Sequence, residues 1–265
     1  NATAGANSVC CCVVSGTCAV WLIDERNGAI LEQIFNYILN LGQRYYDAFF
    51  ADTRYLAYLE GIKNTLIISL FAVLLGVVLG ILVAVVKYVA TGSKNPVLLG
   101  LNKLCRLYVT IVRATPVYLQ IFIIANLIFT ARNMEIYAAI TCFGINSGAY
   151  VSEIIRAGIE SIDKGQFEAG QSLGLSQGTI MKSIILPQAI KNILPALGNE
   201  FITLVKDTSL AQVIAVVELL KVTNNWVSSA VSMVPFVIAA VFYLVMNGVV
   251  TRCFTIAEKR LSYYR

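Results

Sequence analysis

The sequence predicts an all-α, polytopic membrane protein with about five transmembrane helices and a helical loop on the cytoplasmic side. Hydrophobic residues make up 58% of the 265 residues, charged residues only 13%, and the mean hydropathy is +0.74. Soluble domains carry about 25% charged residues. The stretch from Leu66 to Val86 holds no charge, and it has about the length that a helix needs to cross a bilayer. Lipid is therefore the expected solvent for most of the chain.

Four further spans are expected, and one of them is broken. Small-xxx-small spacing at Gly76 and Gly80 predicts close helix packing in the first span. A polar interruption, Lys206 to Ser209, divides the fourth span and points to a transport site, although a short helix and an external loop would give the same pattern. Pro235 is expected to interrupt the last span. The further apolar segments are Val117–Thr130 with an earlier start through Tyr108–Val112, Ile136–Val151, Ile190–Val205 with Leu210–Leu220, and Ser228–Val250.

The distribution of basic residues predicts the orientation. If the first span exits into the cytoplasm, the three inside stretches hold five, four and four basic residues, or 13 of the 20 Lys and Arg. Because cytoplasmic loops are enriched in Lys and Arg, this favours an outside N-terminus and a cytoplasmic C-terminus. The 13 residues are Lys87, Lys94, Lys103, Arg106, Arg113, Arg156, Lys164, Lys182, Lys191, Arg252, Lys259, Arg260 and Arg265.

We divide the chain into an N-terminal region, 1–58, and a membrane domain, 59–265. Val9 to Ile23 is too short to span comfortably and is interpreted as the remnant of a further helix or of a processed leader. From Ala29 to Phe50, apolar residues recur at helical spacing, which predicts an amphipathic helix on the outer surface.

Composition excludes several kinds of function. The chain has no histidine and no acid or Cys cluster of the kind that forms a zinc site or a catalytic triad, so we expect no metal and no enzyme activity. Its basic residues lie between apolar runs without a nucleic-acid motif. The seven cysteines show no CxxC pair and are expected to be free, buried or interfacial thiols.

The loop at about 160–190 predicts two short helices separated by a break. Gly174 suits the left-handed position that follows a helix, and Pro187 is expected to kink or end the second helix, after Thr179–Ile185. A mixed-polarity helical pair is longer than a simple connection needs, which favours a docking surface. The alternative is a loop that packs against its own helix ends.

This loop resembles the EAA loop of ABC importer permeases, whose pattern is EAA, three residues, G, nine residues, I, one residue, LP. The matching residues are Glu168, Ala169, Gly170, Gly174, Leu186 and Pro187, with Gly170 in place of the usual third Ala. In that family the loop forms coupling helices that sit in a groove of the ATP-hydrolysing subunit. The resemblance thus makes these six residues the expected ATPase contact.

Further motifs resemble the permeases for polar amino acids, the subfamily for His, Gln, Glu, Arg, cystine and opines. The resemblance covers about Leu59 to Leu261 and implies a permease in the cytoplasmic membrane of a prokaryote. Expected partners are an ATPase homodimer that binds ATP and Mg, a second identical or paralogous permease, an extracytoplasmic binding protein and lipid. The chain itself lacks a phosphate-binding loop, so we expect it to hold no cofactor. The motif segments are 113–120, 148–158, 165–166 and 206–210.

Polar residues at membrane depth are the candidates for substrate binding. Glu200 and Asp207 are seven residues apart, so an intact helix would place them within ~20° on one face, where they would attract an amino group. Thr208, Ser209 and Gln120 are expected to hydrogen-bond the rest of the substrate. Alternatively, Glu200 pairs with Lys206 or with a basic residue of another helix.

Glu153 and Arg156, three residues apart, fit a structural ion pair, and Arg113 fits a structural or gating role. Three other functions stay open at this point: a permease for another small polar solute, a channel or scaffold unrelated to ABC importers, and a membrane-embedded enzyme.

Overall fold

A computed structural model describes residues 25–230 and 232–262, and these residues contain helices and connections but no β-strand. A boundary after Asp47 divides the chain into two units, which we describe separately. In chain order the elements are α1 Glu25–Phe49, η1 Ala51–Thr53, α2 Arg54–Ala90, α3 Pro96–Ala114, α4 Val117–Leu127, α5 Glu135–Glu160, α6 Lys164–Ser172, α7 Gln177–Ile180, η2 Met181–Ile185, α8 Leu186–Asp207, η3 Thr208–Ile214, α9 Leu219–Ala230 and α10 Val234–Ser262.

Helix α1 accounts for almost all of the first unit that the structure describes. It confirms the helix expected at Ala29–Phe50 and starts a little earlier. Large apolar side chains, among them Phe35, Tyr37 and Ile38, are exposed on it. The segment Val9–Ile23 lies outside the described residues.

Helices α2 and α5 form the central packing of the second unit, through glycines on both sides. A Cβ at Gly76 would lie 2.7 Å from the Ser147 Cβ, and a Cβ at Gly144 would lie 2.5 Å from Leu75 Cδ2. Gly80 and Gly148 repeat these contacts one turn further along each helix. The predicted role of the Gly76–Gly80 spacing is confirmed, because only residues without a side chain let the two backbones approach so closely.

Two helices of the described chain are long and apolar enough to cross a membrane, Ala51–Ala90 and Val234–Arg260. A third candidate is the pair α3 and α4, which is bent by 110° at Thr115 and Pro116. The sequence predicted one span here, starting near Tyr108, and the structure corrects it to two helices. Proline lacks an N–H and restricts the residue before it to extended conformations, which explains a break at this point.

Of the two expected effects of Pro187, a kink or an end of the second loop helix, the structure does not show an end. A π-helical turn, η2, joins α7 to α8, and Pro187 stands in the first turn of α8. A proline in a helix leaves one carbonyl without its N–H donor, and a π turn is one way to change the register around it. The second helix of the loop thus runs directly into the fourth predicted span.

The predicted break in the fourth span is confirmed, whereas the predicted interruption of the last span at Pro235 is corrected. Helix α8 ends at Asp207 and is followed by the 3-10 turn η3, so the polar interruption does break the helix. Pro235 does not interrupt a span, because it lies in the first turn of α10, where a missing N–H costs nothing. The segment that begins at Ser228 belongs in part to α9.

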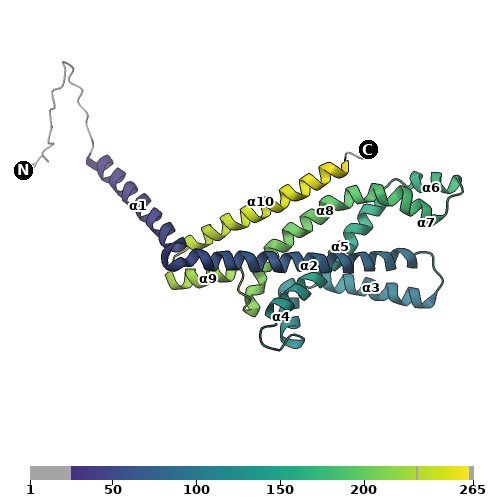
Figure 1. The fold of residues 1–265 in the computed structure, drawn as a ribbon, viewed down its shortest axis with the longest axis horizontal. Coiled ribbons are helices and arrows are strands. Elements are labelled where there is room, and N and C mark those ends of the chain that lie inside the picture. The colour runs from purple at the N-terminus through teal and green to yellow at the C-terminus, as the bar shows by residue number, and fades with distance from the viewer. Residues whose placement is uncertain (1–24, 231, 263–265) are drawn as a thin grey trace, which may run out of the picture. The chain divides into compact units, whose positions relative to one another are not determined.

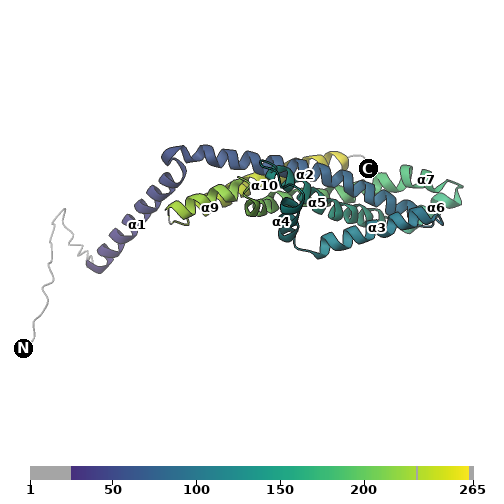
Figure 2. The ribbon, with the colours of Figure 1, turned by 90° about the horizontal axis from the view of Figure 1, so that it is seen from below.

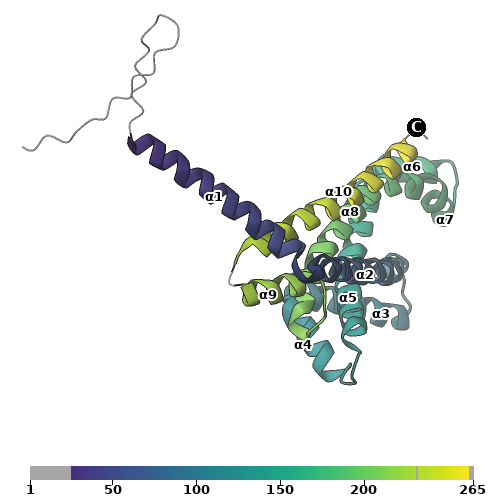
Figure 3. The same ribbon diagram turned by 60° about the vertical axis from the view of Figure 1, so that its left-hand side comes forward.

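Two apolar cores hold the second unit together. One lies between α2, α4, α5, α8 and η3 and includes Ile121 and Phe143, and the other joins α2, α8, α9 and α10 around Tyr58. Helix α10 runs beside α8 (Figure 3). Within this unit, α6 and α7 lie at the same end as the connection from α2 to α3, whereas α9 lies at the opposite end (Figures 1 and 2). Cys142 is a buried free thiol as expected, Cys105 is half-buried, and Cys253 is exposed.

Candidate functional site

Helices α6 and α7 form a hairpin in which a neighbouring side chain caps the N-terminus of each helix. The Asp163 carboxylate accepts a hydrogen bond from Gly165 N at 2.6 Å and begins α6, and Ser176 begins α7 in the same way. Gly174 has φ +74°, and Leu175 N donates to Gly170 O at 3.1 Å. This is a Schellman ending, so the predicted role of Gly174 is confirmed.

Gly170 holds the two helices of the hairpin together. It is buried, and a Cβ on it would lie 2.8 Å from Ile180 Cγ1. The departure from the usual Ala therefore has a local cause, because the missing methyl group allows α6 to rest on α7. The other five predicted coupling residues are exposed: Glu168, Ala169, Gly174, Leu186 and Pro187.

The segments on either side of the hairpin, the end of α5 and the first part of α8, pack against each other. A Cβ at Gly158, near the end of α5, would lie 2.3 Å from Ile193 Cγ1 of α8. Beside it, Asn192 Nδ2 donates to Ser161 Oγ at 2.8 Å. Because the helix also continues without a loop from α7 into α8, a push on the hairpin would reach α8 and α5 directly.

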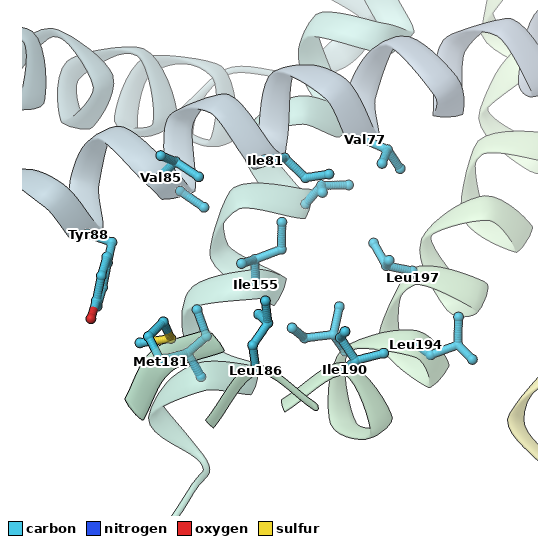
Figure 4. A pocket seen from close by; sticks show the side chains of 14 residues that line it. Val77, Ile81, Val85, Tyr88, Ile155, Met181, Leu186, Ile190, Leu194 and Leu197 are labelled. Atoms are coloured by element: carbon cyan, nitrogen blue, oxygen red, sulfur yellow. The ribbon is translucent and has the colours of Figure 1, made fainter. Parts of the chain in front are cut away.

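An apolar cavity of about 420 Å³ lies behind the hairpin, between α2, α5, η2 and α8. In Figure 4, Met181 and Leu186 line it on one side, and Ile81 and Val85 of α2 line it on the other. Every lining residue but Tyr88 is aliphatic or Met. The space gives the base of the hairpin room to shift against α2 without exposing polar groups.

The structure places the two predicted carboxylates on one helix face. Helix α8 stays continuous through Asp207, so Glu200 and Asp207 share a face and lie about two turns, or ~10.5 Å, apart along its axis. Both side chains are half-buried. No ion pair involves Glu200 within the described residues, which removes the alternative of a pair with Lys206 there.

Sequence reasoning missed Ser147, which neighbours Glu200 from α5. Its side chain is completely buried against Gly76 of α2, and its hydroxyl lies within hydrogen-bonding reach of the Glu200 carboxylate. Buried hydroxyls are almost always paired, and Ser147 therefore orients Glu200 from across the α5–α8 contact. No local pattern in the sequence connects Ser147 to a residue 53 positions away.

Of the other three predicted substrate-binding residues, Gln120 and Thr208 already make hydrogen bonds within the protein. Gln120 Nε2 donates to Val112 O at 2.8 Å and to Thr115 Oγ1 at 2.8 Å, and its Oε1 accepts from Asn146 Nδ2 at 3.0 Å. Gln120 thus holds the bend between α3 and α4. Thr208 is buried and donates to Val205 O, whereas Ser209, half-buried, makes no hydrogen bond in the part of the chain described.

Glu153 is the centre of an ion-pair network at the end of α5. It accepts from Lys87 Nζ at 2.6 Å and from Arg156 Nη2 at 2.9 Å, and Arg113 Nη1 lies 3.8 Å away. Burial raises the pKa of this carboxyl, but the hydrogen bonds from Lys87 and Arg156 outweigh burial and hold the pKa below its usual value. The predicted pair with Arg156 is confirmed, and the structure adds Lys87.

A second buried carboxylate, Glu218, was not predicted. It lies in the short connection before α9, against the beginning of α2, ahead of the charge-free run that starts at Leu66. Its two oxygens accept from Leu220 N at 2.7 Å and Lys221 N at 2.6 Å, and so begin α9. Burial raises the pKa of Glu218 to about 7.

Comparison with known proteins decides the family. The family described as binding-protein-dependent transport system inner membrane component matches residues 76–263, more than half of the chain and all of the hairpin. This chain belongs to that family. Its members are transport subunits and not enzymes, and they lie in membranes.

Relatives and solved structures of this permease family agree with that assignment. A putative glutamine transport system permease protein, GlnP, of Rickettsia typhi is 38% identical over 77% of this chain and 92% of its own length. The arginine transport system permease protein ArtQ of Bacillus subtilis is 35% identical over 77% and 92%. An amino acid ABC transporter solved with histidines is 34% identical with TM-score 0.69, covering 77% of this chain and 94% of that one.

A second solved structure supports the fold alone. The inward-facing MetNI methionine ABC transporter has TM-score 0.68 at 16% identity, over 79% of this chain and 98% of that chain. The all-α membrane fold predicted from sequence is confirmed. The number of crossings stays a prediction.

Proposed function

We propose that this chain is the permease subunit of an ATP-driven importer of polar amino acids. The observation that carries the proposal is the capped α6–α7 hairpin with its exposed Glu168, followed by the exposed Leu186 and Pro187 at the start of α8, in a chain whose relatives bear names of amino acid transport permeases. A capped, externally exposed hairpin that continues into a membrane helix is suited to receive force from another protein.

The substrate would bind at the break after α8. Glu200 and Asp207 would attract the α-amino group or a cationic side chain, and the hydroxyl of Ser209 would accept or donate hydrogen bonds to the rest. Gln120 and Thr208 would contribute less directly, since their donors already serve the chain. Broken helices at such sites supply free backbone groups to a ligand, which supports this location.

Coupling would run through the hairpin. When the partner ATPase closes on ATP and Mg, its groove would pull on Glu168 and Ala169, and the continuous helix from α7 into α8 would carry the movement to Glu200. The chain would bind no nucleotide itself. The apolar cavity behind Met181 would accommodate the shift.

The remaining partners follow from the same proposal. A second permease subunit, identical or paralogous, would complete the pathway, and an extracytoplasmic binding protein would deliver the amino acid. The orientation with α6 and α7 in the cytoplasm is supported by their place at the same end as the basic α2–α3 connection (Figure 1). The N-terminus would then lie outside and the C-terminus inside.

Substrate-stimulated ATP hydrolysis tests the site. The complete transporter would be reconstituted in liposomes and screened over amino acids, with Glu200→Gln and Asp207→Asn beside the wild type. Each variant should raise the half-maximal substrate concentration about tenfold or more, because a charged hydrogen bond of about 1.5–3 kcal/mol is lost. Glu60→Gln, which removes an exposed carboxylate of α2, is the control and should change it little.

Unchanged affinity in both carboxylate variants would remove the proposed site. Stimulation only by another class of polar solute would favour the second candidate function. If the purified chain conducted solute without an ATPase, it would act as a channel and the importer proposal would fail.

A further inference from the structure

A second cavity, of about 570 Å³, opens where α2, α3 and α5 meet. Its wall holds three cations, Lys87 of α2 and Arg106 and Arg113 of α3, against a single carboxylate, Glu153 of α5. Cations that line a cavity together repel one another unless an anion joins them. The excess of positive charge in this wall therefore favours the binding of a negatively charged ligand.

The one carboxylate in the wall cannot supply the missing charge. Glu153 already pairs with Lys87 and with Arg156, which stands outside the cavity, and its distance to Arg113 is longer, 3.8 Å. Arg113 also lies over the ring of Tyr150, with its guanidinium carbon 5.2 Å from the ring centre. Arg106 makes no ion pair or hydrogen bond within the described residues and is exposed.

The hydrogen-bond donors of α3 that line the cavity lie on one face of the helix because of their spacing. Arg106, Thr110 and Arg113 stand at positions i, i+4 and i+7, so they form one stripe along the helix. Two guanidinium groups and a hydroxyl in a row match the several oxygens of a phosphate group, to which Arg donates two hydrogen bonds in a fixed fork. No acidic residue occurs between Gly61 and Met134 to compete for them.

The depth of the cavity identifies the source of the phosphate. Lys87 is the first charged residue after the charge-free run Leu66–Val86, which places the cavity at the boundary of the hydrocarbon core. Leu107 and Ile111, on α3 beside the stripe, are exposed at 54% and 52%. A ligand held here thus has polar donors for its head and apolar side chains for a tail.

We propose that this cavity binds the phosphate of an anionic phospholipid, with Arg106, Thr110 and Arg113 as donors and the acyl chains along Leu107 and Ile111. Basic pockets between membrane helices are suited to such head groups. The site is separate from the proposed substrate site at Glu200 and does not depend on what the chain transports. It would fix α3 against α2 and α5 at the membrane surface.

The test compares lipid retention by the assembled transporter in mixed phosphatidylcholine and phosphatidylglycerol micelles, measured by native mass spectrometry. The wild type should retain phosphatidylglycerol preferentially, and Arg106→Gln should reduce that preference about tenfold, because a charged hydrogen bond to the phosphate is lost. Lys103→Gln removes the same charge one turn away on α3, outside the cavity wall, and should leave the preference nearly unchanged.

Three results would overturn the proposal. The first is an unchanged preference in Arg106→Gln, and the second is an equal loss in both variants, which would indicate general surface charge. In a third arm, inorganic phosphate is added at millimolar concentration. Displacement of phosphatidylglycerol there would assign the site to a free anion, whereas retention supports the lipid.

Discussion

Glu218 shows how one buried charge can make the stability of this protein depend on pH. Its carboxylate is completely buried, and among the residues that the structure describes it accepts hydrogen bonds from the backbone N–H groups of Leu220 and Lys221 and from the Tyr243 hydroxyl, 3.4 Å away. The pKa of about 7 lies above the ordinary value for Glu in an unfolded chain. The folded protein therefore binds this proton more tightly than the unfolded chain does.

The sign of the pH effect follows from this difference. The contribution of Glu218 to stability is complete below the unfolded pKa, and it is lost as pH rises through about 7. We expect the denaturation midpoint of the wild type in detergent to decrease as the pH is raised from about 5 to about 8. Glu218→Gln should flatten this profile, and at low pH it should cost about 1 kcal/mol, because an amide can accept only one of the two backbone hydrogen bonds.

Glu60, exposed on α2, provides the matched control for this experiment. Glu60→Gln should keep the wild-type profile between the same pH values. A Glu218→Gln protein with an undiminished pH dependence would show that another group is responsible.

Residues of the candidate site differ in how far sequence could reveal them. Glu200 and Asp207 belong to one helix, so their common face follows from a spacing of seven. Ser147 and Glu218 acquire their surroundings from helices distant in the sequence, α8 and α2, and no local pattern shows that. Gln120 was identified as polar and membrane-embedded, but its hydrogen bonds to Val112 and Thr115 depend on a bend that was not predicted.

At the scale of elements, the contact between α2 and α5 depends on glycine rather than on apolar bulk. A Cβ at Gly80 would lie 2.5 Å from Val151 Cγ1, a distance that no relaxed structure allows. Gly80→Leu should destabilise the protein by about 1–3 kcal/mol through overpacking. The measurement is the thermal midpoint of the detergent-solubilised protein.

Gly100 of α3 is the matched position, since a Cβ there meets nothing within 4 Å. Gly100→Leu should leave the midpoint close to that of the wild type. If both substitutions lowered the midpoint equally, or neither did, the reciprocal glycine packing would not be what holds α2 to α5.

Helix boundaries show where sequence patterns succeed and where they fail. The ending of α6 at Gly174 and the break after Asp207 were predictable because both rest on local chemistry. The expected interruption at Pro235 was wrong, since a proline in the first turn of a helix looks like one that interrupts it. At Pro187 the sequence left a kink or an end open, and the structure shows a π-helical change of register without an end. The 110° bend between α3 and α4 depends on packing against α5 as well as on Pro116.

For the whole molecule, the two proposed tasks, coupling to the ATPase and substrate binding, would lie at different places along one continuous helical path. The hairpin with Glu168 lies at one end of α8, and the carboxylates Glu200 and Asp207 lie toward the other. Composition predicted the membrane class, and the motif spacing predicted the family, which the comparisons confirm. The assembly with other subunits is a proposal that a single chain cannot display, because a pathway between subunits leaves only half of its wall on each.

The most direct measurement is ATP-dependent uptake of a labelled amino acid by the complete transporter in liposomes, with Gly170→Leu and Gly100→Leu variants. Leucine at position 170 would collide with Ile180 and separate α6 from α7, whereas position 100 has space. We expect uptake only with ATP, a loss of about tenfold or more in Gly170→Leu with basal ATP hydrolysis retained, and wild-type uptake in Gly100→Leu. Uptake without ATP, or full coupled uptake by Gly170→Leu, would contradict the account.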